Sequence, residues 1–108
     1  MTSKRQSVQN SDPDPHLEHR ALDEFFEVLQ RTERRELLVA LDRNASGQLK
    51  LNSRKMTYNS WIALLHSHLP KLEEQELVDW DADTRVVERG RRFDEIRYIL
   101  ELLPGGTA

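Results

Sequence analysis

The stretch Leu64–Val87, LLHSHLPKLEEQELVDWDADTRVV, decides how this 108-residue chain is interpreted. It joins the end of an apolar helical pattern to two short β-like runs, Leu77–Asp81 and Arg85–Val87, separated by Ala-Asp-Thr. These patterns predict a helix that leads into a β-hairpin. Three interpretations compete for the stretch: a nucleic-acid reading head, a metal site on His66 and His68, or a piece of hydrophobic core.

Working outward, apolar residues at helical and alternating spacings predict further elements on both sides. The expected order is a helix opened by Asp14-Pro15, a helix capped by Thr32, a short strand at 48–51, a helix over 57–74, the hairpin, and a helix over 91–103. At 100° per residue, one apolar face of helix 57–74 is predicted to hold Tyr58, Trp61, Ile62, Leu65, Leu69 and Leu72, with Leu64 pointing partly outward.

The order helix, helix, short strand, helix, hairpin, helix is typical of a winged helix-turn-helix. We therefore predict a mainly α domain with a small β-hairpin wing, an α+β fold, over residues 14–103. Residues 1–13 are expected to form a disordered N-terminal tail, and residues 104–108 a flexible C-terminal tail. Only 14 residues, Asn44 to Thr57, separate the second and third helices, so the positioning helix of such a fold is expected to be shortened or missing.

Charge is strongly segregated along the chain. Residues 1–42 carry a net charge of −3, residues 43–72 carry +5 with no acidic residue, and residues 73–108 carry −5. A wholly basic segment in an acidic chain predicts contact with an anion such as phosphate, and the alternative is a chance gap in the placement of acids.

Composition excludes several classes of site. With no cysteine, the chain has no disulfide and no thiolate zinc site. His66 and His68 are two residues apart, about 200° around a helix, so one metal cannot bind both. His68 is instead expected to be a hydrogen-bonded, half-buried structural residue. We find no catalytic motif and expect no enzyme, cofactor or metal. The N-terminus lacks an apolar signal-peptide core, and no run is long enough for a membrane span, so we expect a cytoplasmic protein.

The residues His68-Leu69-Pro70-Lys71-Leu72 to Leu77-Val78 resemble the end of the recognition helix of ArsR-like regulators. Thr32–Leu38 is similar to an earlier helix of the same families. The string HxHLPKL followed by VDWD most closely resembles small haloarchaeal winged-helix proteins, which are regarded as transcription regulators. The resemblance implies a dimeric, cytoplasmic, DNA-binding archaeal module. Glu76 departs from it, because these families usually place glycine there.

The predicted DNA contacts come from the basic segment, the outward face of helix 57–74 and the wing. Phosphate contacts are expected from Arg54, Lys55, Lys71 and Arg85, and base contacts from Asn59, Ser60, Ala63, His66 and Ser67. Three aspartates, Asp79, Asp81 and Asp83, line the wing and weaken its contact with phosphate.

The terminal helices carry apolar stripes that predict a homodimer interface, with packing inside one subunit as the alternative. The interface residues are expected to be Phe25, Phe26, Phe93, Ile96, Ile99, Leu100 and Leu103. The primary hypothesis is a homodimeric, sequence-specific regulator that binds double-stranded DNA. The second is a protein-interaction module on a degenerate winged-helix scaffold that no longer binds DNA and takes another protein as partner.

Overall fold

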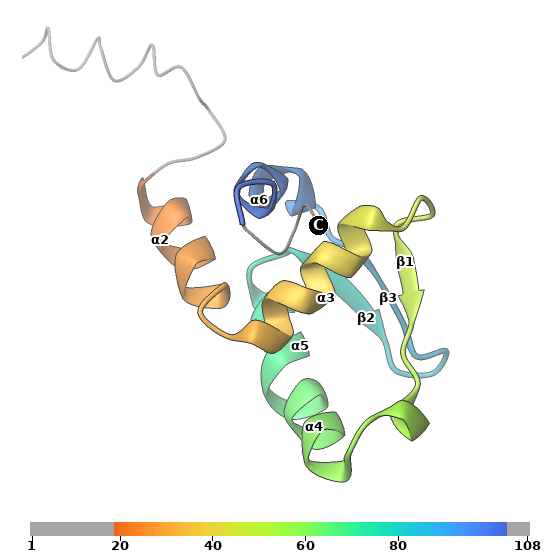
Figure 1. Cartoon of the computed structure of the whole chain (residues 1–108). Helices are drawn as coiled ribbons and strands as arrows, with labels where there is room; N and C mark the ends of the chain where they lie inside the picture. The colour runs from red at the N-terminus through yellow and green to blue at the C-terminus, as the bar shows by residue number, and fades with distance from the viewer. Residues whose placement is uncertain (1–18, 104–108) are drawn as a thin grey trace, which may run out of the picture.

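A three-stranded antiparallel sheet, in the order β1-β3-β2, forms one side of the domain in the computed structural model, which describes residues 19–103 (Figure 1). The hairpin strands are β2, Val78–Asp81, and β3, Val86–Arg89. The single strand β1, Gln48–Lys50, adds to the outer edge of β3, with Leu49 opposite Val87. The short strand and the hairpin that the sequence predicts are therefore confirmed, and they form one sheet.

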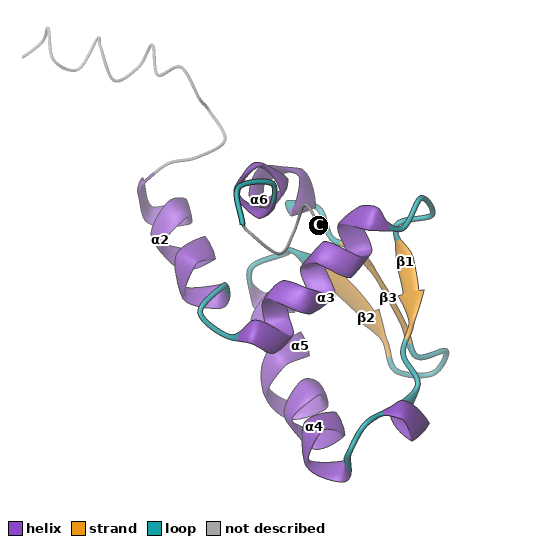
Figure 2. Cartoon of the chain, viewed as in Figure 1, coloured by secondary structure: helices purple, strands orange, loops and turns teal. Residues whose placement is uncertain are grey.

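Helices pack around this sheet and around one another, as Figure 2 shows. Their bounds are α2 His19–Val28, α3 Thr32–Arg43, α4 Tyr58–Ala63, α5 Leu69–Glu74 and α6 Phe93–Leu100. A five-residue π turn, Leu64–His68, joins α4 to α5, so that 58–74 is one continuous helix. The architecture is an α+β helix-turn-helix with a β wing, as predicted.

The element that normally positions a recognition helix is reduced here to one turn of 3-10 helix, Ser53–Lys55. It is held by the side chain of Asn52, whose Oδ1 accepts a hydrogen bond from the backbone N–H of Arg54 at 2.9 Å. The expected shortening is therefore confirmed. The direction of helix 58–74 is set instead by its core contacts and by the hairpin after it.

Several predicted boundaries differ from the observed ones. Thr32 is the first residue of α3 and not its cap, a position that Arg31 takes without a side-chain hydrogen bond. The last helix begins at Phe93 and ends at Leu100, inside the predicted range of 91–103. The helix opening at Asp14-Pro15 and both predicted tails lie outside the described residues.

The π turn changes which residues of helix 58–74 reach the core. Leu64, predicted to point partly outward, is only 7% exposed, whereas Tyr58, predicted to lie on the apolar face, is 76% exposed. One extra residue in a turn rotates the helix on its N-terminal side by about 100° relative to the helix on its C-terminal side. Pro70 gives a physical reason for the wide turn, because in a regular α-helix its ring would clash with the carbonyl group of His66.

The end of α5 turns sharply into the hairpin through a Schellman motif. Leu77 N–H donates to the carbonyl of Leu72 at 3.0 Å, and Glu76 N–H donates to that of Glu73 at 2.8 Å. Glu76 has a φ of 61°, so it adopts the left-handed conformation that glycine takes at this position without a Cβ penalty. The departure at Glu76 thus costs conformational energy without changing the turn.

Arg89 ties the hairpin to the end of α3. Its guanidinium donates to the carbonyl groups of Leu41, Asp42 and Asn44 at 2.9 to 3.1 Å. Cations near a helix C-terminus satisfy carbonyl groups that have no partner within the helix. Arg89 therefore connects the sheet to α3, a function that no local sequence pattern indicated.

Candidate nucleic-acid interface

The start of helix 58–74 is held in place by its own polar residues. Thr57 is the N-cap, and its Oγ1 accepts a hydrogen bond from the backbone N–H of Ser60 at 3.1 Å. The Thr57 and Ser60 hydroxyl oxygens also lie 2.9 Å apart in a hydrogen bond. An N-cap of this kind typically contributes about 1 kcal/mol, so the exposed first turn has a defined conformation.

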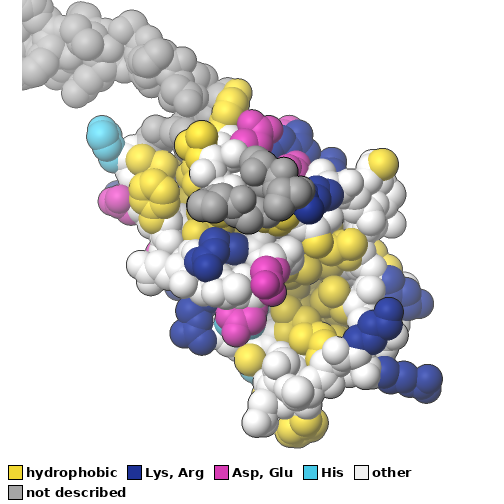
Figure 3. All heavy atoms as spheres, viewed as in Figure 1, with side chains coloured by type: hydrophobic (Ala, Val, Ile, Leu, Met, Phe, Trp, Pro, Cys, Tyr) yellow, Lys and Arg dark blue, Asp and Glu magenta, His cyan; other side chains and the backbone are white. Residues whose placement is uncertain are grey.

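Three elements that adjoin or contact this first turn, or lie beside one that does, carry exposed cations. Arg54 and Lys55 come from the 3-10 turn, Lys50 from β1 and Arg85 from the hairpin turn, and all four side chains are exposed. The backbone of Leu51 donates to the Arg85 carbonyl at 2.9 Å, which places β1 beside the hairpin turn. Figure 3 shows Lys and Arg side chains along the lower right edge of the domain, with no Asp or Glu among them on that face.

Arg85 links the hairpin to the helix. Its guanidinium carbon lies 5.7 Å from the centre of the Trp61 ring, in cation–π geometry. Arg85 belongs to the hairpin turn and not to a strand, and its φ is 61°. A non-glycine residue in this conformation costs about 1–2 kcal/mol. Such outliers are found preferentially at functional sites.

Most of the residues predicted to contact bases are exposed on helix 58–74. Asn59, Ser60, His66 and Ser67 are exposed, and Ala63 is partly buried. These side chains are short or polar, which allows the edge of a base to approach the helix backbone closely.

Lys71, predicted to contact phosphate, forms an ion pair with another helix. Its Nζ lies 3.6 Å from a carboxylate oxygen of Glu27 on α2, and its side chain is partly buried. The residue is also more than ten positions from the cations at the first turn. The structure therefore places Lys71 outside the cluster formed by Lys50, Arg54, Lys55 and Arg85, which we call the basic cluster.

The acids of the wing have a structural function at the hairpin turn. Asp81 Oδ1 accepts hydrogen bonds from the backbone N–H groups of Asp83 and Thr84, at 2.9 and 3.3 Å. Asp79, Asp81 and Asp83 are all exposed. Asp79 and Asp81 lie on β2, whereas Lys50 lies on β1 at the other edge of the sheet. The exposed charges of the two edges of the sheet therefore differ, and Arg85 lies in the turn between β2 and β3.

His68 has the structural function that the sequence predicts, although it is more deeply buried than expected. It is 3% exposed, and its Nδ1 accepts a hydrogen bond from Arg34 Nε at 3.2 Å. Burial lowers the pKa of His68 from its ordinary value, and the Arg34 guanidinium lowers it further. His68 is therefore neutral, and it anchors the π turn to α3.

The residues predicted to form a dimer interface divide into two groups. Phe25, Phe93, Ile96 and Leu100 are at most 2% exposed within the single chain, so their apolar stripes are covered by the chain's own core. For these four residues the alternative, packing inside one subunit, replaces the original prediction. Burial requires α2, α3 and α6 to pack together, as Figure 1 shows.

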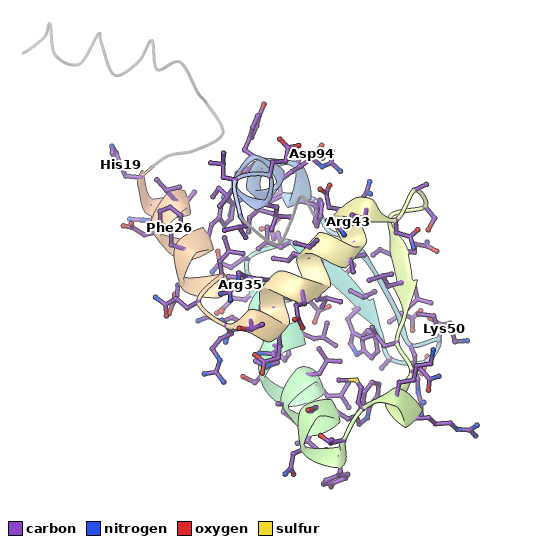
Figure 4. All side chains as sticks on the ribbon, viewed as in Figure 1. His19, Phe26, Arg35, Arg43, Lys50 and Asp94 are labelled. Carbon is purple, nitrogen blue, oxygen red and sulfur yellow. The ribbon has the colours of Figure 1, made fainter. Side chains whose placement is uncertain are left out.

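The other three residues line a groove of about 910 Å³ on the surface between α2, α3 and α6. Its apolar lining is Phe26, Leu29, Val39, Ala40, Ile99 and Leu103. Phe26 is 51% exposed at the edge of this groove. In Figure 4 Phe26 and Lys50 are labelled on opposite sides of the domain, so the groove and the basic cluster lie apart.

Two further observations concern residues 19–103. Within this range no group of three or more His, Asp or Glu side chains is placed to hold a metal ion. None of the helices described there combines the length and the apolar character that a membrane span requires.

Comparison with known proteins adds one finding. No curated protein and no solved structure matches the chain significantly. Residues 39–88, a little under half of the chain, match the family model described as "Domain of unknown function (DUF7344)". The matched segment runs from the second half of α3 into β3, so it contains the basic cluster, the helix 58–74 and most of the hairpin, and it leaves out α2 and α6.

Proposed function

We propose that this protein is a winged helix-turn-helix transcription regulator, similar to ArsR-like regulators, that binds specific sequences in double-stranded DNA as a homodimer in an archaeal cytoplasm. The observation that carries the proposal is the basic cluster. Its four exposed cations come from three elements: Arg54 and Lys55 precede helix 58–74, Arg85 stacks on Trp61 in the first turn, and Lys50 comes from the strand beside Arg85. In winged-helix proteins, this helix enters the major groove and the wing contacts the backbone.

The two kinds of contact are divided between the cluster and the helix. Flexible cations supply affinity that does not depend on sequence, because they replace the counterions condensed on phosphates. The polar face with Asn59, Ser60, His66 and Ser67 supplies the groups that distinguish base pairs. The wing contributes through Arg85 alone, since its other exposed charges are acidic.

Fluorescence anisotropy of a labelled pool of duplexes, titrated at low and at high salt, tests the proposal. We expect saturable binding whose log K falls linearly with log salt, with a slope of about 0.9 for each phosphate contacted. Absence of binding at the lowest salt would reject the proposal.

A matched pair of variants separates the basic cluster from overall charge. Arg54→Glu combined with Lys55→Glu removes two proposed phosphate contacts, which lowers the salt slope by about 2. Arg20→Glu combined with Arg31→Glu changes net charge equally, on exposed positions of α2 and the α2–α3 turn. The second pair is expected to bind within about twofold of the wild type at physiological salt, because charges remote from the contact are screened. If both double variants lost the same affinity for DNA, the loss would reflect net charge and not contacts made by the basic cluster.

The groove between α2, α3 and α6 is the surface that we propose for the homodimer. Phe26 is half exposed at its edge, and Val39, Ala40 and Leu103 are partly exposed. The groove lies away from the basic cluster, so two copies joined there leave both DNA-contacting faces free. Phe26→Asp places a charge at the edge of the groove, and Tyr98→Asp is a control at an exposed aromatic residue on α6. Light scattering after size exclusion is expected to give a dimer for the control and a monomer for Phe26→Asp.

The second candidate is a protein-interaction module that has lost DNA binding. It is favoured by the reduction of the positioning helix to Ser53–Lys55 and by the acidic edge of the wing. Leu64 gives it no support, because this residue is buried in the core. The anisotropy titration separates the two candidates: a dimer that binds no duplex at low salt is the result expected of the interaction module.

A further inference from the structure

Tyr58 is the aromatic residue whose exposure the core does not explain. At 76% it is the most exposed aromatic side chain among residues 19–103. Its spacing from Trp61, Leu65 and Leu69 suits the core face of a regular α-helix, yet it is exposed at the start of the helix, whereas Trp61, also before the π turn, packs partly against the core. The turn is anchored by buried His68 through its hydrogen bond with Arg34. Tyr58 is thus exposed at the start of a helix that the core and His68 hold in place.

Tyr58 has a well-defined position, with cations on the adjoining turn and beside the next aromatic residue of the helix. It is the first residue of the helix, directly after the Thr57 N-cap. Trp61, one turn further, lies on the same side of the helix and carries the Arg85 guanidinium against its ring. Arg54 and Lys55 lie four and three residues before Tyr58, in the adjoining 3-10 turn.

A second exposed aromatic residue provides a contrast. Tyr98 on α6 is 58% exposed, but the surface pocket around it is lined by Asp94, Glu95 and Glu101 as well as by Arg97. That environment repels phosphate. Tyr58 is thus distinguished from Tyr98 by the charges around it and not by exposure alone.

We infer that Tyr58 is an aromatic DNA contact: its ring packs against the apolar parts of the major groove, the thymine methyl groups and sugar edges, while the basic cluster holds the flanking phosphates. This inference rests on the proposed DNA binding and adds a residue to it. Residues in the first turns of a recognition helix are those that reach base edges. Apolar contact with the thymine methyl group is one of the direct modes of sequence reading.

Such a contact has a signature that phosphate contacts lack. Because the ring is uncharged, a variant without it releases as many counterions on binding DNA as the wild type does. The slope of log K against log salt therefore stays the same. The affinity falls by a constant factor at every salt concentration. A residue that acts only through the electrostatic field would change the slope as well.

The test is the duplex titration, repeated at several salt concentrations with Tyr58→Ala, Tyr58→Phe and the control Tyr98→Ala. Tyr58→Ala is expected to bind on the order of tenfold more weakly with an unchanged salt slope. Tyr58→Phe keeps the ring and is expected to bind like the wild type, as is Tyr98→Ala. Thermal melts of all three variants are expected to match the wild type, because both tyrosines are exposed.

The failures of the two proposals are distinguishable. If the wild type binds duplex and Tyr58→Ala binds equally well, Tyr58 is not a contact and the DNA proposal stands. Equal losses in Tyr58→Ala and Tyr98→Ala, or a Tyr58→Phe loss as large as that of Tyr58→Ala, would also overturn the ring contact. If the wild type binds no duplex, the proposed function fails first, and the inference fails with it.

Discussion

Acidification is expected to destabilise the domain through His68. The folded protein buries this side chain as a neutral acceptor for Arg34, and its pKa is lowered by burial and then by that guanidinium. Arg31 also lowers it, whereas Glu33 opposes the shift. In the unfolded chain the imidazole titrates near its ordinary value of about 6.5. The unfolded state therefore takes up a proton at a higher pH than the folded state does.

The sign and size of the effect result from this difference. The stabilisation is fully present above the unfolded pKa and is lost as the pH falls from about 6.5 toward the lower folded pKa. One proton changes the free energy of unfolding by at most about 1.4 kcal/mol per pH unit. For a domain of this size, each kcal/mol corresponds to roughly 4–8 °C in Tm. One unit of acidification below the unfolded pKa thus lowers the Tm by up to roughly 5–10 °C.

The assay is thermal unfolding followed by circular dichroism between about pH 7.5 and about pH 5.5, a window above the titration of ordinary carboxylates. The matched variant is His68→Gln, whose side-chain carbonyl can accept the hydrogen bond from Arg34 and does not titrate. Its Tm is expected to fall less than that of the wild type over the same window. The remaining histidines are common to both proteins, so their titration cancels. An equal fall in both proteins would refute the assignment to His68.

Three further expectations concern stability and the strained hairpin turn. Arg89→Ala removes hydrogen bonds to the last carbonyls of α3 and is expected to lower the free energy of unfolding in urea by about 2 kcal/mol. The control Arg91→Ala loses only a surface ion pair with Glu76 and is expected to cost under about 1 kcal/mol. Similar costs for the two variants would argue against a stabilising role of Arg89 at the end of α3. Gly90→Ala places a Cβ 2.6 Å from the Glu76 carbonyl oxygen and 2.7 Å from the backbone of Leu77, so a loss of about 1–3 kcal/mol or more is expected, and a neutral change would show that the hairpin can shift. Arg85→Gly and Arg85→Ala both remove the cation, so both are expected to bind DNA more weakly, with a salt slope lower by about 1. Because the φ of residue 85 is 61°, Arg85→Gly is expected to be about 1 kcal/mol more stable than Arg85→Ala in urea unfolding.

The resemblance of 66–81 to a recognition helix and wing stays a prediction about function, although the fold it implied is present. The basic segment from Arg43 to Leu72 was visible as a run of charge, and its members Arg54 and Lys55 are exposed in the 3-10 turn before helix 58–74. Lys71 belongs to the same run but pairs with Glu27, which lies 44 positions earlier in the chain. No local pattern contains that information, because the partner comes from a different helix.

Tyr58 illustrates the same limit within one helix. Hydrophobic periodicity assumes about 3.6 residues per turn throughout, and it therefore assigned Tyr58 to the core and placed Leu64 partly outward. The signal that could have corrected the assignment was Pro70, since a proline inside a long helix requires a local change in hydrogen bonding. Its position indicates that the helix must adjust, but not that the adjustment is a π turn beginning at Leu64.

The sequence by itself determined the order of the elements, the wing, the short connection at 44–57 and the segregation of charge, because these depend on local periodicity, turn residues and composition. Only the tertiary structure decided which apolar faces are covered, which cations are paired and which aromatic residue is exposed. Phe25 and Phe26 are adjacent and chemically identical, yet one is fully buried and the other is half exposed at the edge of a groove. The physical reason is that burial depends on what packs against a face, and those neighbours are set by contacts between residues far apart in the chain.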